Sequence, residues 1–168
     1  MRFTLAKQRA KIAHLNFRQE MHGDEPVLAV DVKVEADVTN DFLSELSPTL
    51  KWSLYDKAED VQGSLVAEAG HMPRLRYPDL GALKWAGKME GVEFVLQGLA
   101  EKKGLALTGA LDKLRLECKE GGTVAISWSA AVRPTEAQSA KMAGMLGQDV
   151  LVSVSGGTAA AETPDSGE

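Results

Sequence analysis

The sequence predicts a mainly β fold of the α+β kind: an antiparallel sandwich or a bent sheet of long hairpins, with two short helical segments. From Leu28 to Val38 every second residue is apolar, and most residues between them are charged. Residues 123–132 repeat this alternation with serine and alanine between the larger apolar side chains. A period of two indicates strands with one face on a core and one in water, which is typical of antiparallel sheets.

The first hairpin is expected over residues 11–38. Its first strand is Lys11–Met21, and the segment HGDEP at 22–26 suits a turn because Gly23 can adopt turn conformations. Pro26 stands where a proline can begin a strand. The alternating segment that follows is then the second strand of this hairpin.

The first helical segment is expected at 41–55. Asn40 can cap a helical turn, and Ser47 followed by Pro48 matches an N-cap with proline at the first helical position. The segment therefore contains either two short helices or one helix kinked near Pro48.

The middle of the chain is predicted to be β-rich. The expected strands are Leu83–Trp85, Val92–Leu96, Leu105–Thr108, Leu111–Cys118 and Thr123–Val132. A tight turn with a glycine pair separates the last two, so these two strands form a second long hairpin.

The second helical segment is expected at 135–146. Thr135 and Gln138 match a capping box, and Gly147 suits the end of the helix. A short strand at Asp149–Ser153 follows.

The chain is expected to form one β-rich domain over residues 1–155, with an acidic tail over 156–168. This tail has no apolar residue larger than alanine. Such a segment cannot bury enough apolar surface to offset the entropy of ordering it, so it is expected to be disordered.

Composition excludes several classes of protein. The net charge of −5 argues against bulk attraction to polyanions, although local basic patches remain compatible with it. A single cysteine, Cys118, excludes an internal disulfide and a multi-cysteine zinc site. The chain has neither a long apolar run nor a signal-peptide pattern near its start. A soluble, cytoplasmic protein is therefore expected.

No catalytic motif is present, so we expect a protein that is not an enzyme and has no cofactor or metal. The sequence lacks a nucleophile elbow, a phosphate-binding loop and a dinucleotide fingerprint. The segment HGDE, with His22 and Asp24, offers metal-ligand atoms, but a polar hairpin turn explains it better. Cys118 lies on the apolar face of its strand, where packing is the more natural role than reactivity.

Charge is distributed unevenly along the chain. Residues 2–18 contain five basic residues and no acidic one, whereas the tail is acidic. This asymmetry is typical of proteins that bind single-stranded nucleic acid through a basic face. Arg9, Lys11 and Arg18 are the candidate contacts. Base stacking would also need exposed aromatic residues, yet Phe17 and Trp128 are among those expected in the core.

A second group of candidates lies between residues 74 and 85. Arginine and aromatic residues are enriched at the centres of interfaces. The candidates are Arg74, Arg76, Tyr77, Lys84 and Trp85. In the alternative interpretation, which is slightly favoured for the last two, the indole packs at the rim of the core and the lysine points outward.

Three segments carry a resemblance: HGDEPVLAVDVKVEADVTNDFLSELSPTLKWSLY, GALKW and KEGGTVAISWSAAVRP. Together they resemble small uncharacterised proteins encoded by tailed bacteriophages and prophages, over most of residues 10–155. The resemblance implies a viral origin and expression in the cytoplasm of a bacterial host. It assigns no role to any residue.

The expected function is that of a non-catalytic phage or prophage accessory protein that binds a host or phage macromolecule. A protein partner is expected, or self-association as a homo-oligomer through strand edges or through the methionine-bearing helix. The alternative is a single-stranded DNA-binding or recombination accessory protein. No membrane association is expected.

Overall fold

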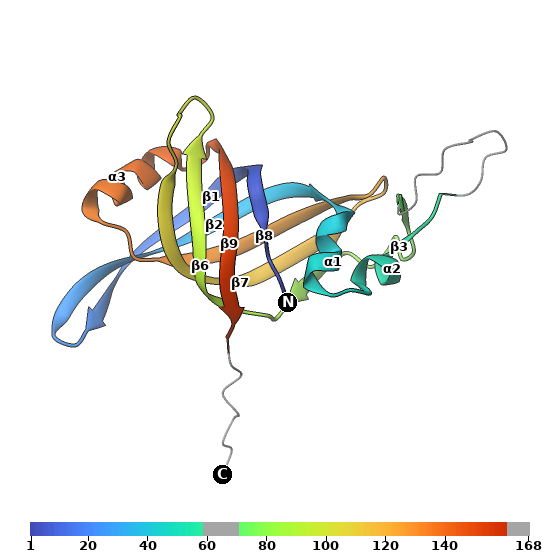
Figure 1. Ribbon diagram of the computed structural model, residues 1–168, viewed down its shortest axis with the longest axis horizontal. Coiled ribbons are helices and arrows are strands. Elements are labelled where there is room, and N and C mark those ends of the chain that lie inside the picture. The colour runs from blue at the N-terminus through green and yellow to red at the C-terminus, as the bar shows by residue number, and fades with distance from the viewer. Residues whose placement is uncertain (59–70, 161–168) are drawn as a thin grey trace, which may run out of the picture.

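The computed structural model describes residues 1–58 and 71–160, which form an antiparallel β barrel (Figure 1). The barrel strands are β1 (Leu5–His22), β2 (Glu25–Thr39), β6 (Met89–Gly98), β7 (Leu105–Cys118), β8 (Thr123–Val132) and β9 (Asp149–Ala159). Their spatial order is β7-β6-β9-β1-β2-β8, and pairing of β8 with β7 closes the ring. A short strand, β5 (Ala82–Trp85), pairs with the second half of β7.

The mainly β prediction is confirmed, but the sandwich is wrong because six strands close into one barrel. Alternation shows that a strand has one buried face; it does not show which strands pair at the ends of the sheet. Here β7 pairs with β6 and β5 along one edge and with β8 along the other. Within the barrel itself, closure thereby removes the open edges that a sandwich would have to protect.

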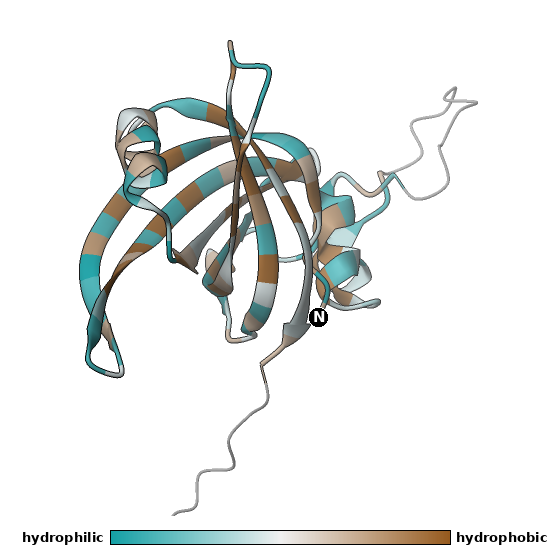
Figure 2. Cartoon of the chain, turned by 60° about the vertical axis from the view of Figure 1, so that its left-hand side comes forward, coloured by the Kyte–Doolittle hydropathy of each residue, from teal (hydrophilic) through white to brown (hydrophobic). Residues whose placement is uncertain are grey.

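Hydrophobic and hydrophilic residues alternate along the barrel strands (Figure 2), and the buried apolar side chains form the core. Val30, Val32 and Val34 of β2 are at most 2% exposed, as expected from the alternation. Trp128 of β8 is buried, and Phe3 packs edge-on against it with ring centroids 5.2 Å apart. The alternating residues therefore line a packed core.

The first hairpin is longer than predicted and extends beyond the barrel (Figure 1). β1 pairs with β9 only as far as Lys11, and β2 pairs with β8 only from Val30 onward. We call residues 14–29 the arm; its two-residue turn has Gly23 at φ +63°. Phe17 lies on the arm and is 45% exposed, so its expected place in the core is wrong.

Two short helices follow β2, as predicted: α1 (Leu43–Leu46) and α2 (Leu50–Leu54), with a 3₁₀ turn at Asn40–Phe42 before them. The predicted caps are wrong. Ser47 follows the end of α1, and Thr49 is the N-cap of α2 without a side-chain hydrogen bond. The Asn40 amide is buried and donates a hydrogen bond of 2.7 Å to the Met72 carbonyl. A small two-stranded sheet, β3 (Tyr55–Asp56) with β4 (Arg74–Leu75), completes this region.

The predicted second helix is confirmed as α3 (Glu136–Met145). Thr135 and Gln138 form the expected capping box, and Gly147 follows the helix at φ +73°, a conformation that favours glycine. Met142 and Met145 are buried against the core. The Gly147 amide then donates to the Ile12 carbonyl, which positions the chain to enter β9.

The last strand runs past the predicted start of the tail at residue 156. Residues 156–159 pair with β6 through backbone hydrogen bonds, which do not require large side chains. At Gly157 a Cβ would lie 2.6 Å from a Val92 methyl, so glycine permits the close approach of the two strands. The rest of the expected tail, 161–168, lies outside the described residues. Among the helices of the described part of the chain, none has the length and hydropathy to cross a bilayer.

Candidate cationic groove

A depression of about 790 Å³ lies on the outer wall of the barrel, where β1, β2, β8 and β7 run side by side and β5 joins them. We call it the cationic groove. Five basic side chains and one imidazole line it: Lys33, Lys84, Lys88, Lys113, Arg115 and His14. Asp31 is the single acidic residue among its lining residues. The groove is therefore strongly basic although the whole chain carries a net charge of −5.

A β bulge in β1 places His14 on this surface. Ile12 pairs with Val34, but the next pair joins His14 to Lys33, so Ala13 is an extra residue on β1. The insertion turns His14 outward beside Lys33, and both side chains are exposed. Bulges commonly redirect a side chain in this way.

A second β bulge, in β7, places Lys113 in the groove. Asp112 pairs with Ser129 and Arg115 with Ser127, so two residues of β7 oppose Trp128 alone. Lys113 has φ +53°, in the left-handed region that non-glycine residues seldom adopt. As a result Lys113 and Arg115 both face the groove, while Leu114 between them is buried.

Strand β5 contributes two residues to the lining of the groove, Lys84 and Trp85. Lys84 pairs directly with Arg115, so these two cations share the outer face of the sheet. Trp85 pairs with Leu114, on the inner face; its ring packs partly on the core, and its Nε1 lies 3.2 Å from the Met1 sulfur. The interpretation in which the indole packs at the core rim and the lysine points outward is thus confirmed.

The single carboxylate of the groove is neutralised within the protein. Arg18 donates to both oxygens of Asp31, at 2.9 and 3.2 Å. These hydrogen bonds hold the pKa of Asp31 below its usual range, with smaller contributions from Asn16 and the nearby Lys113. Asp31 therefore stays ionised, and its charge is matched by Arg18 rather than by the groove lysines alone.

A neighbouring depression on the same strands has a different character. It has a volume of about 750 Å³ and includes the predicted contacts Arg9 and Lys11. Its other charged residues are Lys33 and Arg115, which also line the cationic groove, and four acidic residues: Glu35, Asp37, Glu117 and Asp149. Arg9 is already paired with Asp149 at 2.9 Å. We call it the mixed depression, because its charges nearly balance.

The candidates at residues 74–77 lie away from the groove. Arg76 donates to the backbone carbonyls of Trp52 and Tyr55, at 2.8 and 3.1 Å, and so ties β4 to α2. Arg74 of β4 lies opposite Asp56 of β3 in the register of the two-stranded sheet. Tyr77 is 59% exposed in the segment that follows β4. Of the eight residues predicted from the sequence, the groove gathers Lys84 and Trp85.

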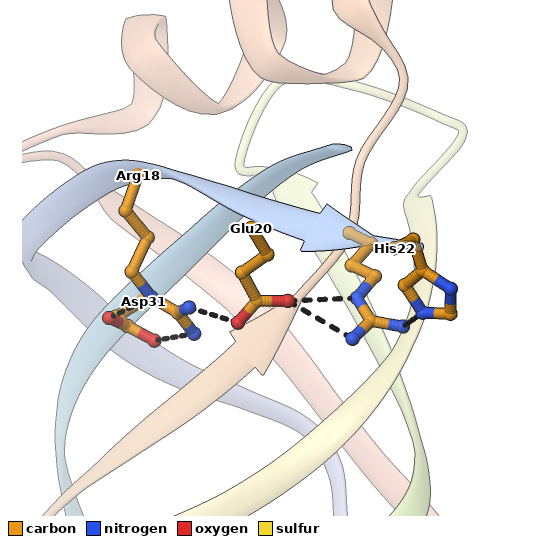
Figure 3. A network of polar contacts seen from close by, with 5 residues as sticks. Arg18, Glu20, His22 and Asp31 are labelled. Carbon is orange, nitrogen blue, oxygen red and sulfur yellow. Dashed lines mark hydrogen bonds and ion pairs between the residues drawn. The ribbon is translucent and has the colours of Figure 1, made fainter. Parts of the chain in front are cut away.

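The charged side chains at and near the HGDE turn lie in a chain of polar contacts. Arg18 bridges Asp31 and Glu20, and Arg133 bridges Glu20 and His22, in one chain of contacts along the arm (Figure 3). The His22 ring nitrogen lies 2.9 Å from a guanidinium nitrogen of Arg133, which would repel a metal cation. Within residues 1–58 and 71–160 no three acidic, histidine or cysteine side chains converge as metal ligands.

Cys118 packs against the core, as predicted, and is half-buried. Burial raises the pKa of its thiol, an effect that the neighbouring Tyr55 hydroxyl partly offsets. Burial and the neighbouring thiol raise the pKa of Tyr55 in turn. An activated nucleophile needs the opposite shift of its pKa.

Comparison with protein-family models, curated proteins and solved structures gives no match. The resemblance to phage proteins therefore remains a prediction.

Proposed function

We propose that the protein is a non-catalytic binding module that holds single-stranded nucleic acid by its phosphates along the cationic groove. The observation that carries this proposal is the charge of the groove. Five lysine and arginine side chains and His14 line the groove with one carboxylate, which Arg18 already neutralises, and Lys33 also contacts Glu35 at 3.8 Å. Such a concentration of positive charge on an otherwise acidic protein is typical of a binding site for an anionic ligand.

The layout of the charges favours a polymer over a single anion. Lys33, Lys113 and Lys84 come from three different strands, β2, β7 and β5, so the positive charge extends across the sheet. A flexible single strand can follow such a surface and present successive phosphates to it. Ser127 and Ser129 on β8 add hydroxyl donors between the lysines.

The groove favours binding without sequence preference. Trp85 and Trp128 border it, but strand register places both on the inner face of the sheet, and Trp128 is 1% exposed. Base stacking needs an exposed ring, so affinity here would come from phosphate contacts and would fall steeply with salt.

The groove is also poorly equipped for catalysis. In the described part of the chain, no hydrogen bond joins the hydroxyls of Ser127 or Ser129 to His14 or to Asp31. Nucleophilic catalysis needs such a contact between nucleophile and base. We place the module among phage or prophage accessory proteins of the bacterial cytoplasm, in keeping with the sequence resemblance.

Fluorescence anisotropy with a labelled oligothymidine strand tests the proposal. The variant Lys84→Glu/Lys113→Glu should bind at least about tenfold more weakly, a loss of ~1.4 kcal/mol. The matched control is Lys102→Glu/Lys103→Glu, which makes the same charge change on exposed lysines of the β6–β7 loop. For about four phosphate contacts, log K should fall with log salt at a slope of roughly −3.

Equal weakening in the groove variant and the loop variant would contradict the proposal, because it would reflect net charge alone. Displacement of the strand by polyglutamate at matched charge would instead indicate an acidic protein as the ligand.

A further inference from the structure

The two edges of the arm differ in a way that bears on self-association. Within the residues that the structure covers, no strand pairs with β1 beyond Lys11 on its outer edge, apart from the backbone contacts of Ile12. The β2 edge of the arm is likewise unpaired before Val30, but it carries Pro26. Proline and lysine on an edge discourage pairing with another chain. Residues 14–22 of β1 contain neither.

The unprotected edge also borders exposed apolar side chains. Phe17 is 45% exposed and Met21 is 65% exposed, although both lie in a regular strand. Each is two residues from Gln19, so all three point to the same face of the arm. An unpaired edge beside an exposed apolar row is the surface that strand addition uses.

We propose that a second copy of this chain pairs with that edge, β1 against β1, in an antiparallel dimer with its two-fold axis through Gln19. Residues equally distant from Gln19 then face each other across the interface. Arg18 of one copy lies opposite Glu20 of the other, and Phe17 lies opposite Met21. Both faces of the joined sheet are therefore complementary, and opposite charges or apolar pairs placed directly across strands are stabilising.

Neighbouring registers lose this complementarity. Centring the axis on Arg18 places two arginines opposite each other, and centring it on Glu20 places two carboxylates opposite each other. Centring it between residues joins the apolar face of one copy to the charged face of the other. Among the registers centred on or between residues 18 to 20, the one through Gln19 avoids these defects and is the one that places Arg18 opposite Glu20 and Phe17 opposite Met21.

The contacts already present on the arm support this arrangement. Arg18 and Glu20 form an ion pair on the charged face of the arm (Figure 3), and Arg133, which follows β8, pairs with Glu20 from outside the arm. These side chains are 27–54% exposed, so a second copy can meet them without desolvating isolated charges. A two-fold axis makes the interface isologous, which is the commonest way for soluble proteins to dimerise.

The dimer is independent of nucleic-acid binding and is tested on the full chain by sedimentation equilibrium. The wild-type protein should dimerise in a concentration-dependent manner. Met21→Lys should be monomeric, because it places a lysine against the second copy's Phe17 on the shared edge. Leu99→Lys is the matched control: Leu99 is 51% exposed in a loop, and its replacement should leave the dimer intact. Circular dichroism checks that both variants fold.

Single cysteines then identify the register, in a Cys118→Ala background treated with oxidised glutathione. Gln19→Cys should give a disulfide-linked dimer because residue 19 faces itself across the axis. Arg18→Cys, Glu20→Cys and the loop variant Lys103→Cys should stay monomeric on a denaturing gel.

Three outcomes would overturn the proposal. They are a wild-type monomer at every concentration, a dimer that Met21→Lys leaves unchanged, and cross-linking of residue 18 or 20 at the level of residue 19.

Discussion

The two long hairpins share an alternating sequence pattern but differ in how many neighbours they have. β8 pairs with β2 on one side and β7 on the other along almost its whole length. The first hairpin has such neighbours for only part of its length, and the rest projects as the arm. Trp128 on β8 is consequently 1% exposed and Phe17 on the arm 45%. Alternation thus marks a face that can be buried, whereas neighbouring strands decide whether it is.

The largest expected effect separates these two aromatic residues. Trp128→Ala should lower the free energy of unfolding by about 3–5 kcal/mol, because it leaves a cavity in the barrel against Phe3. Phe17→Ala should change it by less than ~1 kcal/mol at low protein concentration, because much of that ring is already in water. Urea denaturation of both variants measures the difference. Similar losses in the free energy of unfolding of the two variants would mean that the arm packs as tightly as the barrel wall.

A smaller effect is expected at the bulge of the second hairpin. Lys113→Gly should raise the free energy of unfolding by about 0.5–1 kcal/mol, because glycine relieves the strain at φ +53°. The same change should weaken nucleic-acid binding because it removes a groove cation. Lys113→Ala is the matched control: it should weaken binding without the gain in stability. Urea denaturation and anisotropy report the two effects separately, and equal stability of the glycine and alanine variants would argue against strain.

The smallest expected effect is the pH dependence of stability that comes from the ion pair between Arg18 and Asp31. Arg18 lowers the pKa of Asp31 in the folded state. The pair therefore stabilises the fold at pH values above the unfolded pKa of about 3.9, and this contribution is lost as pH falls through the lowered folded pKa. The wild type should be more stable than Asp31→Asn at neutral pH, and the difference should shrink in acid. Urea titrations across this range measure it, with Asp24→Asn at the exposed turn as the control; a constant difference would contradict the linkage.

Much of the local structure follows from the sequence. The strict alternation of Leu28–Val38 predicts β2, and the capping box at Thr135 predicts α3. These signals depend on residues close together in the chain. Barrel closure depends on pairing of β2 with β8 and of β9 with β1 and β6, which are not neighbours in the sequence, and no local pattern contains that information.

The groove was only partly predictable, for the same reason. Lys84 stands out beside Trp85, but Lys113 and His14 reach the groove through bulges, which are defined by partner strands. One local signal was available: two polar residues, Asp112 and Lys113, interrupt the alternation between Leu111 and Leu114. Arg9 and Lys11 were expected from the basic start of the chain, yet the fold places them among acidic side chains in the mixed depression.

The position of β9 between β1 and β6 has a consequence for biosynthesis. A nascent chain that has emerged only as far as α3 can pair β1 with β2, β6 with β7 and β7 with β8, but the ring stays open. One edge of β1 and one edge of β6 then have unpaired backbone amides and carbonyls until residues 149–159 leave the ribosome. β9, the last strand of the described residues to be synthesised, completes the ring. The nascent chain is therefore most vulnerable to aggregation after α3 has emerged and before β9 has paired.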